Sequence, residues 1–298
     1  MSNFTAKFSG HQTFPLRYGW LYKYAETDTS KLNQVDELMV EWGVGKNMVE
    51  AIKYWARQAG AEQDIGPYSV VHSNDPYLEN IESLWIIHWL LCHDHLELTS
   101  IKVFFNYYNG LTVDRGVLFD FLQHLFSKQN FIADTKKAQV LKAPSDSSLK
   151  KDLGVLFLMY TSSTSSKKTE DSFASPLSEL GLIKQVDKSS YSCELEERVT
   201  LSNEVFTFCV LEYFCYLKER NKLARTLAFD SFLMAPGSPA RIFRMSQSEV
   251  ERRLDAVAKL TNGAIDWTDT QGLRQIQITD ESVLSKDSNL AFLKKMYK

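Results

Sequence analysis

Apolar residues recur with the spacing of an α-helix through most of the first half of this 298-residue chain. Such a period constrains the fold more strongly than any single residue, because it specifies one buried face. Leu16, Trp20 and Tyr24 stand four residues apart, which predicts a helix over 15–26. Gly19 inside this helix suggests that another backbone packs closely against it. Further helices are predicted at 76–92, 100–108 and 114–129.

Two short helices are predicted on either side of a glycine turn. They cover 33–42 and 46–58, with Gly43 and Gly45 between them, which is the arrangement of a helix-turn-helix. The second helix would present residue types that suit a DNA groove, since lysine and arginine bind phosphates or guanine and asparagine binds adenine. These outward residues are Lys46, Asn47, Glu50, Lys53, Tyr54 and Arg57. Because the same arrangement is common in helical cores that bind no DNA, both interpretations stay open.

A wing would complete this unit. The segment 64–71 follows the second helix and is interrupted by Gly66 and Pro67, so it is predicted to be a hairpin or an irregular loop.

The second half of the chain has hairpin and helix signals. A hairpin is expected around Asp187 and Lys188, followed by a helix over 202–220. Ser246 and Glu249 resemble a capping box ahead of a helix over 247–261, and strands are expected at 264–267 and 273–278.

Together these signals predict a mainly α fold with small β-hairpins and winged helix-turn-helix domains. The predicted organisation is an N-terminal helical DNA-binding domain, a Ser/Thr-rich linker or loop, and a C-terminal α+β winged-helix-like domain, over 1–160, 161–178 and 179–298.

Charge and targeting signals point to an ordinary cytoplasmic protein. The chain has 34 Lys and Arg against 37 Asp and Glu, which argues against a basic coat over the whole surface. Six lysines against two aspartates nevertheless give the segment 128–151 a local charge of +4. Such a segment is either a solvated surface or a contact with DNA. The longest apolar run, 84–92, is half of what a membrane-spanning helix needs, and residues 1–10 hold no apolar signal region.

The motifs for nucleotide and zinc binding are incomplete. Lys46 follows a glycine as in a phosphate-binding loop, but Asn47 replaces the hydroxyl residue that would hold magnesium. His88 and Cys92 share a helical face and stand near His93, Asp94 and His95, yet no second ligand pair has a matching spacing. We therefore expect the protein to bind neither a nucleotide nor zinc.

No complete nuclease motif is visible either. Asp75, Glu79 and Glu82 are acids at a helix start, where the helix dipole already explains them. Glu194 and Glu196 lie near the hairpin without a lysine at the required spacing.

Several segments carry a resemblance to a known family. They are 8–21 (FSGHQTFPLRYGWL), 43–49 (GVGKNMV), 52–55 (IKYW), 75–79 (DPYLE) and 84–89 (LWIIHW). They look like the successive signatures of a bacterial domain-of-unknown-function family found in DNA phosphorothioation operons, that of the B component of the single-strand phosphorothioation (Ssp) defence system. The resemblance is strong over 8–95 and weaker beyond, through 104–106, 175–183 and 243–246.

The resemblance implies a function as well as a family. It implies a protein that binds double-stranded DNA and nicks one strand, with Mg²⁺ or Mn²⁺ if the nicking is intrinsic, so that sulfur can replace a phosphate oxygen. The implied partners are the ATPase and the ATP-pyrophosphatase-like sulfur-transfer enzyme of the same operon. The alternatives are a non-catalytic winged-helix adaptor or regulator that recruits these enzymes to DNA, and a protein-binding scaffold.

Candidate residues for the chemistry come from the acids above and from the first signature. His11, Arg17 and Tyr18 are candidates for catalysis or phosphate contact, and Gln12 stands where the family motif has glutamate. The acids Asp75, Glu79 and Glu82 are the other catalytic candidates. A structural interpretation of His11, as a capping or bridging side chain, remains open.

Overall fold

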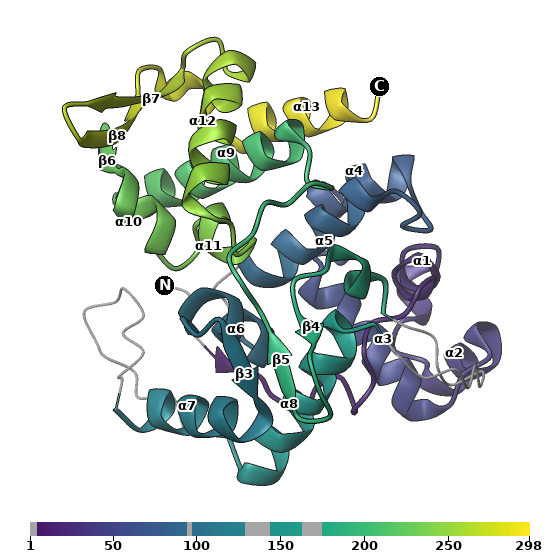
Figure 1. The fold of residues 1–298 in the computed structure, drawn as a ribbon. Helices are drawn as coiled ribbons and strands as arrows, with labels where there is room; N and C mark the ends of the chain where they lie inside the picture. Colours follow the sequence, from purple (N-terminus) through teal and green to yellow (C-terminus); the bar gives the residue numbers. More distant parts are fainter. Residues whose placement is uncertain (1–4, 94–96, 129–143, 163–174) are drawn as a thin grey trace.

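The structure is a computed structural model that describes residues 5–93, 97–128, 144–162 and 175–298 (Figure 1). It is mainly helical, as predicted, with small sheets of two or three strands among the described residues. No helix within the described ranges is both long and apolar enough to cross a lipid bilayer.

The first part of the described chain is helical, with α1 and α2 packed on α3 and α4 packed on α5. The bounds are α1 (Trp20–Ala25), η1 (Thr29–Lys31), α2 (Val35–Trp42), α3 (Lys46–Gln58), α4 (Pro67–Asn74) and α5 (Ile81–His93), with the parallel pair β1 (Thr5–Ala6) and β2 (Glu97–Leu98). Every residue from Ser83 to Trp89 is buried, so α5 is surrounded by protein on all sides. In Figure 1 it lies between the upper and lower halves of the molecule.

Three predictions for this part are corrected by backbone conformation. The helix predicted over 15–26 begins at Trp20 because Gly19 has a φ of +74°, and this conformation, not close packing, explains the glycine. The helix predicted from 76 begins only at Ile81, after Leu78 at φ +58°. The wing predicted over 64–71 is wrong: Pro67 starts the helix α4, since its fixed φ suits a first helical position.

A helix–strand unit follows in the middle of the chain. Its elements are α6 (Ser100–Tyr107), β3 (Thr112–Asp114), α7 (Arg115–Lys128), α8 (Asp146–Tyr160), η3 (Pro176–Leu180), β4 (Lys184–Gln185) and β5 (Ser190–Ser192). The strands form an antiparallel sheet in the order β3-β5-β4, so β5 lies in the middle. The hairpin around Asp187 is confirmed.

The same order of elements occurs again in the last third of the chain. Its elements are α9 (Asn203–Glu219), β6 (Thr226–Ala228), α10 (Phe229–Met234), α11 (Pro239–Ile242), α12 (Gln247–Leu260), β7 (Ile265–Thr270), β8 (Leu273–Ile278), η4 (Glu281–Val283) and α13 (Lys286–Met296). The sheet order is β6-β8-β7, which matches β3-β5-β4 position for position. Half of the predicted capping box is present, since the Ser246 hydroxyl accepts from the Glu249 N–H. The other half is wrong, because the Ser246 N–H donates to the Glu196 carbonyl and the Glu249 carboxylate pairs with arginines instead. We name these repeated arrangements the middle unit and the C-terminal unit.

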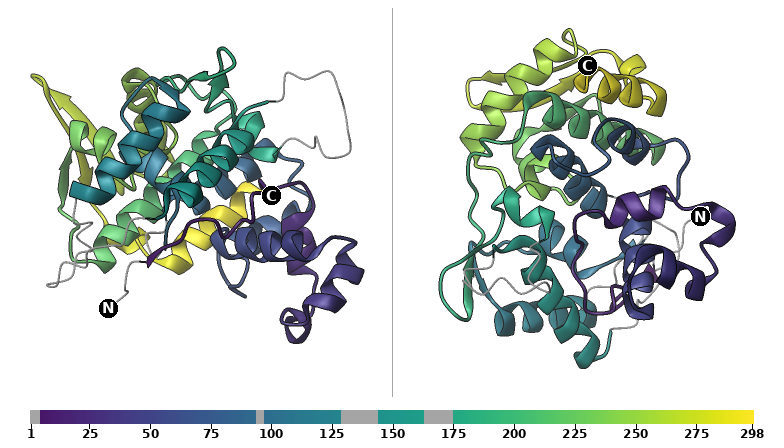
Figure 2. Two further views of the ribbon diagram at one scale, coloured as in Figure 1. Left: turned by 90° about the horizontal axis from the view of Figure 1, so that it is seen from below. Right: turned by 90° about the vertical axis from the view of Figure 1, so that its right-hand side faces the viewer.

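The middle unit crosses the boundary predicted at 161–178. β3 belongs to the first predicted domain and β5 to the second, yet they pair from Thr112 with Ser192 to Asp114 with Ser190. Most of that predicted linker, 163–174, lies outside the described residues. Figure 2 shows the two units in further views, with α2 at the periphery of the molecule.

Candidate nucleic-acid interface

The two helices predicted on either side of the glycine turn are present as α2 and α3. Gly43 ends α2 in a left-handed conformation, φ +66°, and its N–H donates to Met39. Val49, Ile52 and Trp55 of α3 are buried, because they recur on the face that packs on α1 and α2.

The outward side of α3 carries most of the predicted contact residues. Lys46 and Asn47 are exposed at its first turn. Lys53 lies 4.0 Å from Glu50, and exposed Arg57 lies 3.5 Å from Glu62, so both cations have an acid beside them. Such exposed pairs are worth about 1 kcal/mol or less, so these lysine and arginine side chains can exchange a carboxylate for a phosphate.

Tyr54 does not share this outward side. It is 6% exposed, and its ring fills the space beside Gly10, where an added Cβ would lie 2.4 Å from the ring. Burial raises the pKa of its hydroxyl well above the ordinary value. The prediction that Tyr54 faces outward is therefore wrong, and the reason is that the first signature segment covers it.

His11 of that segment is buried and holds the segment against α8. It is 2% exposed, and its Nε2 lies 3.2 Å from the Asp152 carboxylate, without the alignment of a hydrogen bond. Its Nδ1 accepts from the Thr13 N–H at 3.1 Å, which leaves the ring proton on Nε2. Asp152 also accepts from the Ser9 N–H at 2.7 Å. This geometry supports the bridging interpretation of His11.

Arg17 and Tyr18 lie nearer the surface. The Arg17 guanidinium lies over the rings of Phe14 and Trp20, 5.7 Å and 5.5 Å from their centroids. Tyr18 is 43% exposed, and its hydroxyl donates to Glu179. Partial burial and this carboxylate raise the pKa of Tyr18, so the hydroxyl stays protonated, and it would have to leave Glu179 to donate to a phosphate.

The candidate acids are not gathered around a common point. The two oxygens of Asp75 accept from the N–H groups of Glu79 and Asn80, at 2.9 and 3.0 Å, and so shape the turn before α5. Among the described residues, no group of three or more His, Cys, Asp or Glu side chains is placed to hold a metal ion. The residues present therefore do not fit a magnesium site formed by Asp75, Glu79 and Glu82.

His88, the centre of the possible zinc cluster, joins three parts of the core. Its Nδ1 lies 2.7 Å from the Tyr160 hydroxyl and its Nε2 lies 3.2 Å from the Ile242 carbonyl. Complete burial lowers the pKa of His88 to about 3, so the ring is neutral. Asp94 and His95 lie outside the described residues.

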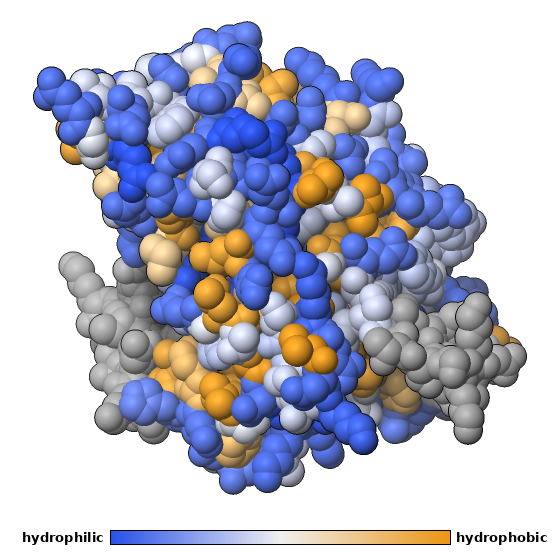
Figure 3. All heavy atoms as spheres, in the orientation of Figure 1, coloured by the Kyte–Doolittle hydropathy of each residue, from blue (hydrophilic) through white to orange (hydrophobic). Residues whose placement is uncertain are grey.

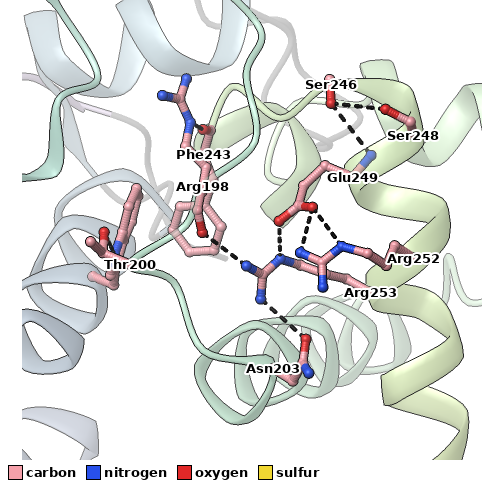
Figure 4. Close-up of polar contacts among 10 residues, drawn as sticks. Arg198, Thr200, Asn203, Phe243, Ser246, Ser248, Glu249, Arg252 and Arg253 are labelled. Atoms are coloured by element: carbon pink, nitrogen blue, oxygen red, sulfur yellow. Dashed lines mark hydrogen bonds and ion pairs between the residues drawn. The ribbon is translucent and has the colours of Figure 1, made fainter.

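A buried ionic network, missed at the sequence level, joins the C-terminal unit to the segment before α9 (Figure 4). Glu249 is fully buried and lies 2.6 Å from both Arg253 and Arg252. Arg253 also donates to the Arg198 carbonyl, and Arg198 donates to the Phe243 carbonyl. The spacing of an acid three and four residues before two arginines could have indicated this cluster.

The basic stretch 128–151 is described only in part. Lys150 and Lys151 are exposed on α8, whereas 129–143 lies outside the described residues.

Comparisons with known proteins agree with this architecture. A crystal structure described as SspB superposes with a TM-score of 0.79 at 23% identity, covering 99% of this chain and 89% of the other. A magnesium-ion-bound SspB crystal structure has a TM-score of 0.77 at 23% identity, with coverage of 99% and 88%. No curated protein matches the chain. The profile of a family described as "protein of unknown function (DUF4007)" matches residues 8–297, and the chain therefore belongs to the DUF4007 family.

Proposed function

We propose that this protein is a DNA-binding component of a bacterial DNA phosphorothioate modification or defence system. The observation that carries the proposal is an order that occurs twice among the described residues: a helix, a strand, three helical segments and a hairpin, with the first strand beside the last. A winged helix has a similar order of elements, and such units commonly place a helix in the DNA major groove, which supports the proposal. The likeness to SspB supports the assignment to a phosphorothioation system.

The proposed DNA contacts lie outside these two units, on the outward side of α3, the second helix of the pair α2 and α3. Lys46 and Asn47 are placed at its first turn to reach base edges, and Lys53 and Arg57 to reach phosphates. Arg17 and Tyr18 are proposed as additional phosphate donors.

The test is duplex binding by a Lys53→Ala/Arg57→Ala variant, measured by fluorescence anisotropy across a salt series. Losing two phosphate contacts should weaken binding and reduce the salt slope by about 2. The matched control is Lys31→Ala, which removes an exposed lysine of η1 paired with Glu41. Unchanged affinity and slope in the double variant would show that α3 is not the contact helix.

Strand nicking is the second step of the proposal. It is supported by the magnesium-bound state of a similar structure, but the described residues do not assign its metal ligands. Supercoiled plasmid incubated with Mg²⁺, Mn²⁺ or chelator tests it directly: a nicking enzyme yields open circles that chelator suppresses.

An adaptor that recruits the ATPase and sulfur-transfer enzymes is the alternative. The half-exposed apolar side chains of Leu195 and Met234 favour it, since exposed apolar surface commonly marks a protein contact. An adaptor should bind DNA without yielding open circles.

A further inference from the structure

A cavity of about 220 Å³ opens where the middle and C-terminal units meet. It lies among the loop after α6, the segment after β5, and the helices α10 and α11. Apolar side chains form most of its wall, including Leu195, Leu233, Met234 and Met245. In Figure 3, apolar side chains gather on the molecular face over α10, α11 and the segment that follows β5.

Two arginines line this cavity, and neither is paired with an acidic side chain among the described residues. Arg244 is 2% exposed, and its guanidinium donates to the carbonyls of Tyr108 and Gly110 at 3.3 and 2.7 Å. Arg241 donates its Nε–H to the Asn106 carbonyl at 3.2 Å. Neither arginine forms an ion pair with any described residue, and no Asp or Glu lines the cavity.

The neighbouring arginines of the same junction differ in this respect. Arg198 has Glu196 at 3.3 Å and Arg253 has Glu249 at 2.6 Å, so the chain neutralises those buried charges itself. Burial and the nearby Arg244 lower the pKa of Arg241 to about 10, which leaves its guanidinium charged at neutral pH. The cavity therefore concentrates positive charge that an outside anion can neutralise.

We propose that the cavity binds a carboxylate that stands next to an apolar side chain on a partner protein. The outer N–H groups of Arg241 form the fork that a carboxylate accepts. Gln247 of the wall begins α12, so the positive end of that helix adds to the attraction. The rim favours a protein over DNA, because Leu195 and Met234 are about half exposed there (49% and 54%). Interfaces with DNA are more polar and richer in positive charge.

The test uses N-acetyl-L-leucine as the probe, since it carries a carboxylate beside one apolar side chain. It is titrated into the full chain with ¹³C-labelled methionine methyl groups, because Met234 and Met245 lie in the cavity wall. Saturable shifts of both signals are expected, together with at least tenfold weaker binding of N-acetyl-L-leucinamide, which lacks the charge.

Variants then test whether the charge of Arg241 and the apolar wall each contribute to probe binding. Arg241→Gln should weaken probe binding at least tenfold, and Leu195→Ala should weaken it while leaving Arg241 in place. Arg225→Gln is the matched control, because Arg225 is exposed and not part of the cavity. An unchanged thermal midpoint and circular dichroism spectrum show that each variant is folded.

Three results would overturn the proposal. Acid and amide could bind equally, or Arg241→Gln could bind the acid like the wild type. A short DNA duplex could instead shift the two methionine signals in an Arg241-dependent way while the probe has no effect, and the site would then bind phosphate. The probe titration measures no DNA affinity. The cavity proposal can therefore fail while the proposed function in DNA binding holds, and the reverse.

Discussion

Among single residues, His11 and Asp152 show how the first signature segment, 8–21, is held against α8. Asp152 is 1% exposed and accepts from the Ser9 N–H as well as facing His11. We expect Asp152→Asn to lower the free energy of unfolding by about 2 kcal/mol or more, since a buried group loses a charged acceptor. Denaturant unfolding measures this effect.

The matched control for this change is Asp146→Asn at the exposed start of the same helix. Its carboxylate accepts from Gln123 at 2.8 Å on the surface, so we expect a loss of about 1 kcal/mol or less. Equal, small effects of both changes would contradict the bridging function of Asp152 and His11.

His88 predicts how stability depends on pH. Its pKa is about 3 in the folded chain against an ordinary 6.5, so the unfolded chain binds more protons between these values. Stability contributed by neutral His88 is therefore lost as pH falls from 6.5 toward 3, by up to about 1.4 kcal/mol per pH unit. His88→Gln should flatten this part of the unfolding profile, and an equally steep profile would contradict the assignment.

At the scale of elements, Glu249 joins α12 to the segment before α9. Glu249→Gln leaves Arg253, 3% exposed, without its charge partner, and we expect a loss of about 3–5 kcal/mol. Glu251→Gln on the same helix is the control, because its carboxylate is partly exposed and should cost about 1 kcal/mol or less. Thermal and denaturant unfolding of both variants would expose any failure of this ranking.

Elements with a complete local signal were predictable from sequence. The capped helix after Ser246 and the helices around Gly43 agree with the structure within a few residues, because period, caps and turn residues all act locally. The wing predicted near Gly66 failed because Pro67 starts a helix as readily as it interrupts a strand. The sheet of the middle unit could not be predicted, since β3 has three residues and its partner β5 follows only after α7, α8 and η3.

The candidate site also contains some residues whose position the sequence predicts and others whose position it does not. Lys46, Asn47, Lys53 and Arg57 lie on the predicted side of α3 because helical spacing alone specifies it. Burial of Tyr54 and pairing of His11 with Asp152 depend on contacts between distant segments, which spacing does not contain.

At the scale of the whole molecule, these long-range contacts predict that the halves depend on each other. In a fragment of residues 1–160, β3 lacks β5, and Phe157 lacks the Tyr191 ring that stacks on it at 4.0 Å. His88 lacks the Ile242 carbonyl as well. We expect no cooperative urea transition for this fragment under conditions where the full chain shows one. A transition of equal steepness and midpoint would instead support the predicted boundary at 161–178.

We propose that this molecule engages double-stranded DNA through phosphate contacts. Fluorescence anisotropy of a labelled duplex, titrated with the full chain from about 50 to 200 mM salt, tests it most directly. We expect the logarithm of the binding constant to fall linearly with the logarithm of the salt concentration, with a slope of about −0.9 for each phosphate contacted. Absence of binding at the lowest salt, or affinity that does not change with salt, would contradict it.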